Sequence, residues 1–81
     1  MELKDTMELM VSENYKDRFK AEYYQAKLRY DKLHKMLIKH EAGTLDFELS
    51  CPPEILEKQV CYMGNYLKTL EIRAEIEKIE L

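Results

Sequence analysis

The sequence has few of the residues that turn or break a chain. Among 81 residues there are two glycines, two prolines and no tryptophan. A β-sandwich needs many short strands joined by turns rich in glycine and proline, so this composition argues against one. Hydrophobic residues make up 46% and charged residues 36%, which is too apolar for a disordered chain. The composition therefore predicts one small, all-α unit.

Long hydrophobic runs are also absent. No apolar stretch approaches the roughly 20 residues that a membrane-spanning helix needs, and no secretory hydrophobic segment is present. We therefore expect Cys51 and Cys61 to be reduced thiols in a cytoplasmic protein.

An excess of basic residues is missing as well. The net charge of −3 argues against a general nucleic-acid binder. The charge is unevenly placed, because residues 16–40 hold eight Lys/Arg against three Asp/Glu, whereas residues 41–81 hold four against nine. The two halves can attract each other, and the basic half can face an anion.

Two segments carry apolar residues at helical spacing. In the first they are Tyr15, Phe19, Tyr23, Ala26, Tyr30, Leu33 and Leu37, and in the second Leu56, Val60, Met63, Leu67, Leu70 and Ala74. Gly43 is typical of a residue just after a helix, and Pro53 of a first helical residue. We predict an arm over residues 1–12 and an antiparallel helical hairpin over residues 13–81. Its helices cover about 14–41 and 53–80, joined by a connector over 42–52 that is extended at Leu45, Phe47 and Leu49.

A second apolar stripe predicts that the hairpin forms a homo-oligomer. Ile72, Ile76 and Ile79 lie on the far side of the second helix from its main stripe. Either the arm, through Met7, Leu9, Met10 and Val11, or a second subunit covers them. A lone hairpin of this size is marginally stable, so we place Ile72, Ile76, Ile79 and Gly64 in an oligomer contact, where glycine permits close backbone approach.

One flank of the first helix combines cations with aromatic rings. It consists of Lys16, Lys20, Tyr23, Lys27, Tyr30 and His34. Lysines attract phosphates, and tyrosine rings can stack on bases. Such a flank suits an anionic nucleotide held between two subunits. Alternatively, the tyrosines are edges of the core and the lysines pair with acids of the second helix, at Glu54, Glu57, Glu71 and Glu75.

The remaining arginines, histidines and cysteines suggest binding and form no catalytic or metal-binding motif. Arg73 suits either a phosphate contact or an interfacial ion pair, and Arg18 and Arg29 are expected to be solvated. His34 and His40, six residues apart, point to different sides of a helix, and the cysteines lack metal-ligand spacing. There is no nucleophile–base motif and no glycine-rich phosphate loop. We therefore expect no enzyme activity, no metal and no cofactor.

From Asn14 onward the sequence resembles a family of small proteins of tailed phages and prophages, related to a crAss-like phage gene product. The residues that carry the resemblance are Tyr15-Lys16-Asp17-Arg18-Phe19, Ala42-Gly43-Thr44-Leu45-Asp46-Phe47, Cys51-Pro52, Leu56-Glu57-Lys58-Gln59, Met63-Gly64-Asn65-Tyr66-Leu67 and Arg73-Ala74-Glu75-Ile76-Glu77. Short phage proteins of this kind are often accessory factors that blunt host immunity. The resemblance supplies no functional residues.

Together these observations suggest a non-enzymatic phage factor in the cytoplasm of an infected bacterium. It would antagonise host defence by sequestering an anionic nucleotide signal, of cyclic or ADP-ribose type, on the flank from Lys16 to His34. The alternatives are a protein-binding inhibitor of a host immune complex, similar to an anti-CRISPR protein, and a structural coiled-coil component of the phage.

Overall fold

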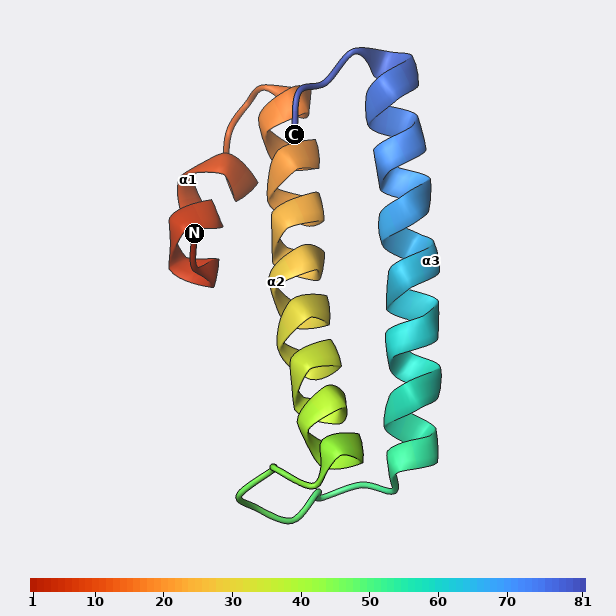
Figure 1. Cartoon of the computed structure of the whole chain (residues 1–81). Coiled ribbons are helices and arrows are strands. Elements are labelled where there is room, and N and C mark those ends of the chain that lie inside the picture. The colour runs from red at the N-terminus through yellow and green to blue at the C-terminus, as the bar shows by residue number, and fades with distance from the viewer.

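The computed structural model describes residues 1–81, and all its regular elements are helical. A short 3₁₀ turn, η1 (Leu3–Thr6), leads into a single helical turn, α1 (Met7–Met10). Two long helices follow, α2 (Tyr15–Ala42) and α3 (Pro53–Glu77). They run antiparallel and pack against each other (Figure 1). The predicted all-α fold with two long packed helices is therefore confirmed, whereas its oligomerisation stays a prediction.

Local signals set three of the four ends of the long helices. The side chain of Asn14 accepts a hydrogen bond from the Lys16 N–H at 2.9 Å, which caps α2. Gly43 follows α2 with a φ of 78°, a left-handed conformation that glycine adopts without steric cost. Pro53 opens α3, where its missing N–H would have had no partner within the helix.

The fourth end corrects the sequence prediction, because α3 stops at Glu77 instead of continuing to residue 80. Lys78 adopts a left-handed conformation with a φ of 58°, and the Ile79 N–H donates to the Ala74 carbonyl at 2.8 Å. This turn brings Ile79 into the core, where it is only 5% exposed. Left-handed backbone costs about 1–2 kcal/mol, and burying an isoleucine side chain returns about 1.5–3 kcal/mol. Ile79 is therefore a core residue, outside the exposed stripe.

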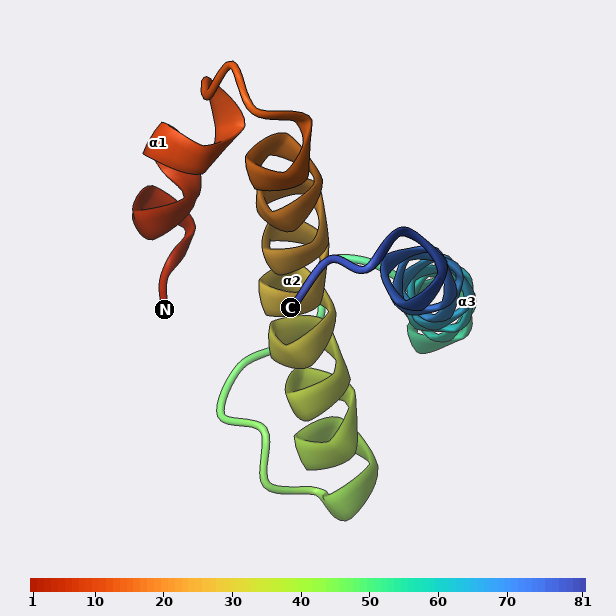
Figure 2. The ribbon, with the colours of Figure 1, turned by 90° about the horizontal axis from the view of Figure 1, so that it is seen from above.

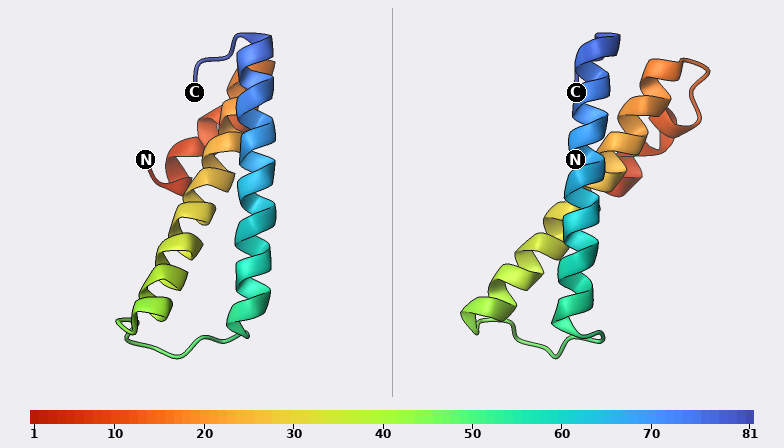
Figure 3. Two further views of the ribbon diagram at one scale, coloured as in Figure 1. Left: turned by 45° about the vertical axis from the view of Figure 1, so that its right-hand side comes forward. Right: turned by 90° about the vertical axis from the view of Figure 1, so that its right-hand side faces the viewer.

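The core lies at the open end of the hairpin, away from the connector. Its main members are Phe19 and Tyr23 of α2 and Leu67, Leu70 and Ala74 of α3. Figure 3 shows the two helices crossing and then separating toward the connector. The apolar residues there, such as Leu33 and Leu37, are only half-buried. Eight of 81 residues are buried in all, so the hairpin has a small core for an independent domain.

The N-terminal arm packs on the opposite side of α2 from α3 (Figure 2). Of the two alternatives for covering the stripe of α3, the one that uses the arm is therefore wrong. Thr6 is fully buried, and its Oγ1 accepts a hydrogen bond from Gln25 Nε2 at 2.9 Å while donating to the Leu3 carbonyl at 2.7 Å. These bonds fix the arm on α2, and Val11 remains 74% exposed.

The connector is a series of bends without an extended strand. Leu45 and Leu49 are half-buried, but Phe47 is 56% exposed, so the three do not form one buried face. No helix in the structure is both long enough and apolar enough to cross a membrane.

We predict that Thr6→Val loosens the arm without unfolding the hairpin. Valine keeps the shape but loses both hydrogen bonds of the hydroxyl and leaves the Gln25 amide unpaired, at a cost of about 1–2 kcal/mol. Amide hydrogen exchange of residues 3–10 should accelerate about tenfold while the core amides of α2 and α3 stay protected. Thr44→Val, at an exposed position of the connector, is the control. Unchanged exchange in the arm would contradict the anchoring role.

Candidate functional site

The predicted flank lies along one side of α2, between the face that contacts α3 and the face that the arm covers. Its six side chains recur every three or four residues, which keeps them on one side of a helix at about 100° per residue. Their surroundings differ along its length. Tyr23 is buried, Lys20, Lys27 and Tyr30 are half-buried, and Lys16 and His34 are exposed.

Tyr23 belongs to the core rather than to an open binding surface. It is 8% exposed, and its hydroxyl donates to Glu71 Oε2 across the hairpin at 2.7 Å. Burial, together with the neighbouring Glu71 carboxylate, raises the pKa of the phenol from 10.0 to about 12. The interpretation of this tyrosine as an edge of the core is therefore the correct one.

Tyr30, His34 and Lys27 form the aromatic and cationic part of the flank. The rings of Tyr30 and His34 are stacked, with centroids 5.5 Å apart and planes 6° from parallel. Lys27 Nζ lies 5.6 Å from the centre of the Tyr30 ring and pairs with Asp31 Oδ1 at 3.0 Å. The outer ring of this stack belongs to the exposed His34, so the stack presents an aromatic surface to solvent.

Lys16 and Lys20 supply free positive charge at the other end of the flank. Neither side chain makes an ion pair or a hydrogen bond within the chain. No lysine of α2 pairs with Glu54, Glu57, Glu71 or Glu75, so the predicted lysine–glutamate pairing is wrong. Three glutamates instead bind tyrosine hydroxyls of the facing helix. Tyr23 binds Glu71, Tyr15 binds Glu77, and Tyr66 of α3 binds Glu22 of α2.

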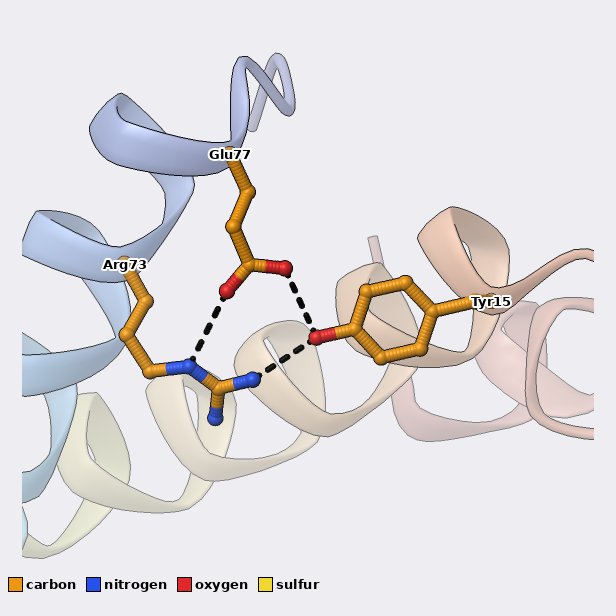
Figure 4. A network of polar contacts seen from close by, with 3 residues as sticks. All are labelled: Tyr15, Arg73 and Glu77. Atoms are coloured by element: carbon orange, nitrogen blue, oxygen red, sulfur yellow. Dashed lines mark hydrogen bonds and ion pairs between the residues drawn. The ribbon is translucent and has the colours of Figure 1, made fainter.

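Arg73 lies on the other edge of the hairpin, away from the flank. It is two residues from Glu71, about 200° around α3, so the two side chains leave the helix on opposite edges. Its Nε donates to Glu77 Oε2 at 3.2 Å and its Nη2 donates to the Tyr15 hydroxyl at 2.7 Å (Figure 4). The Tyr15 hydroxyl in turn donates to Glu77 Oε1 at 2.8 Å, which raises the pKa of this phenol.

This network assigns Arg73 to an ion pair within the chain. The guanidinium also lies 5.0 Å from the centre of the Phe19 ring. Sequence reasoning overlooked Tyr15 and Glu77 as its partners, although the spacing of four residues between Arg73 and Glu77 is typical of helical ion pairs. Arg73 and the lysines of the flank are not brought together in one chain.

The residues predicted to form an oligomer contact lie in different places. Ile72 and Ile76 are 51% and 74% exposed, on the side of α3 turned away from α2. Gly64 faces Tyr30 within the hairpin, where an added Cβ would come 3.4 Å from the ring. Close approach of the two helices of one chain is thus enough to explain this glycine.

The structure holds no group of three His, Cys, Asp or Glu side chains placed to bind a metal ion. Cys51 and Cys61 are free thiols.

We predict that Tyr23→Phe lowers the free energy of unfolding at neutral pH by about 1–2 kcal/mol, because it removes a hydrogen bond to a carboxylate. The raised pKa also gives a pH dependence. The phenol of Tyr23 ionises near pH 10 in the unfolded chain but only near pH 12 in the folded protein. Its contribution to the free energy of unfolding is therefore complete below pH 10 and is lost as the pH rises through 12. Urea unfolding between pH 7 and 12 should show this loss in the original protein and a smaller one in the variant. Tyr30→Phe keeps the ring and removes a hydroxyl that makes no hydrogen bond within the chain, so it should change neither.

Comparison with known proteins identifies a family for this chain. No curated protein and no solved structure matches it, and no match names a phage protein, so the relation to phages stays a prediction. The family model described as Sequestin matches residues 13–76. The match contains both long helices almost completely and leaves out the arm. Because it covers most of the sequence, the chain belongs to the Sequestin family.

Proposed function

We propose that the protein binds and sequesters a small anionic nucleotide, without catalysis, as a phage factor that antagonises host defence. The family name points to sequestration, which requires binding and release but no reacting groups. The main support from the structure is the stack of Tyr30 and His34 beside Lys27, on a side of α2 that is left open.

The flank offers separate places for the base and the phosphates. A base stacks on the exposed ring of His34, since stacking on aromatic side chains tolerates every base. Lys27 stands beside the stack, and Lys20 follows about 10 Å further along α2 at 1.5 Å per residue. Lys20 has no partner in the chain, so a phosphate does not have to displace a carboxylate there. The spacing suits an extended nucleotide with more than one phosphate.

Hydrogen bonds between tyrosines and glutamates leave the positive charge of the flank lysines available for a ligand. Glu71 of α3 accepts the hydrogen bond of Tyr23 instead of binding a lysine. The acidic half of the chain therefore contacts the basic half through tyrosine hydroxyls, and Lys16 and Lys20 remain unpaired.

We predict that isothermal titration with cyclic and ADP-ribose-derived nucleotides detects a ligand of the full-length protein. Lys20→Glu with Lys27→Glu should weaken binding at least tenfold, because two attractive charges become repulsive. Lys58→Glu with Lys68→Glu makes the same change of charge at exposed positions of α3 and should have little effect. No heat with any nucleotide, or an equal loss in both variants, would contradict the proposal.

We also propose that the protein forms a homo-oligomer through the outer face of α3. Ile55, Tyr62, Ile72 and Ile76 are all more than half exposed on this helix. Positions 55, 62, 69 and 76 recur every seven residues and, together with Ile72, carry no charge, although charged residues make up 36% of the sequence. A second copy of α3 is the partner of matching shape and polarity. In such a dimer the two flanks do not face each other, so we place the nucleotide on the flank of one copy instead of between two subunits, where the sequence had suggested it.

Light scattering after gel filtration should give a mass above that of the 9.8 kDa monomer. Ile72→Asp with Ile76→Asp should reduce it to the monomer mass while circular dichroism stays helical, because charge is costly in an apolar contact. Ile38→Asp, on α2, is the control, since Ile38 is 52% exposed and comparable to Ile72. A monomer at all concentrations would show that this proposal is wrong.

A further inference from the structure

A groove lies between the N-terminal arm and the face of α2 that is turned away from α3. Its volume is about 540 Å³, within the range of small-molecule sites. Its floor is apolar and its rim is mostly cationic. The lining residues that matter here are Leu3, Leu28, Lys4, Arg29, Lys32 and Lys35.

The buried anchor of the arm builds one wall of this groove. Thr6 binds Gln25 of α2 and the Leu3 carbonyl, so the first turn of the chain is held against α2. Leu28 of α2 lies one helical turn beyond Gln25 and lines the same groove as Leu3. The wall and the floor are therefore fixed relative to each other by a hydrogen bond between elements.

The positive charge of the groove is mostly uncompensated. Its two carboxylates already have cationic partners, since Glu2 lies 3.4 Å from Lys4 Nζ and Asp31 lies 3.0 Å from Lys27 Nζ. In contrast, Arg29, Lys32 and Lys35 make no ion pair or side-chain hydrogen bond within the chain. This concentration of positive charge stands out in a protein whose net charge is −3.

We propose that this groove is a second anion site, for a small organic phosphate. Arg29 can hold a phosphate through two parallel hydrogen bonds, and Lys32 and Lys35 add charge without directional demands. The apolar part of the ligand packs against Leu3 and Leu28. The groove shares no lining residue with the flank, so the site is distinct from the flank and goes beyond the proposed function.

The test is a titration of the isotope-labelled full-length protein with ADP, followed residue by residue by NMR. Saturable shifts are expected at Leu3, Leu28, Arg29 and Lys32. Arg29→Glu with Lys32→Glu should weaken binding at least tenfold. Lys58→Glu with Lys68→Glu, which changes the charge equally, should weaken it less than threefold. No saturable shift in the groove, or an equal effect of both variants, would overturn the site.

Two further measurements separate this site from the flank and test its apolar part. Lys16→Glu with Lys20→Glu, at flank lysines without a partner in the chain, should leave the ADP shifts in the groove unchanged, even if it abolishes nucleotide binding at the flank. Shifts confined to residues 16–20 and 34 would instead overturn the groove site. Inorganic pyrophosphate should bind at least threefold more weakly than ADP, and equal binding would show that Leu3 and Leu28 do not contact the ligand.

Discussion

The structure depends on the packing of Phe19 of α2 against α3 at the open end of the hairpin. Phe19 is 2% exposed, and the most deeply buried large apolar side chain, Leu70, belongs to the same cluster. Arg73 covers the Phe19 ring from one edge of the interface, and Tyr23 with Glu71 closes the other edge. A very small apolar core is thus bounded on both edges by polar contacts that join the two helices.

These edge contacts decide which polar groups remain free for binding. The carboxylates that cross between the helices bind tyrosine hydroxyls, in the pairs Tyr23–Glu71, Tyr15–Glu77 and Tyr66–Glu22. The lysines of α2 therefore stay unpaired or pair within their own helix. A basic helix beside an acidic one would ordinarily neutralise its charge in ion pairs. Here the helix keeps two cationic surfaces, the flank and the groove under the arm.

Sequence reasoning placed the residues of the flank on one side of the first helix but could not say which of them are buried. Periodicity places Tyr23, Lys27 and Tyr30 on neighbouring positions of one helix, yet it does not say how far α3 covers them. The structure buries Tyr23, leaves His34 open and stacks the Tyr30 ring on it. Arg73 shows the same limit. Its charge suggested either a phosphate contact or an interfacial ion pair, and the position of Tyr15 on the facing helix shows that it is engaged within the chain.

The sequence by itself determined the helices, because their signals are local. Apolar spacing, the Asn14 cap, Gly43 and Pro53 act within a few residues of the chain, and both long helices begin and α2 ends at those signals. Only the tertiary structure decided the side of α2 on which the arm lies, the burial of Ile79, and the hydrogen bond from Arg73 to Tyr15. Each of these depends on residues distant in sequence, such as Thr6 with Gln25, whose meeting is set by the packing of whole elements and leaves no periodic trace in the chain.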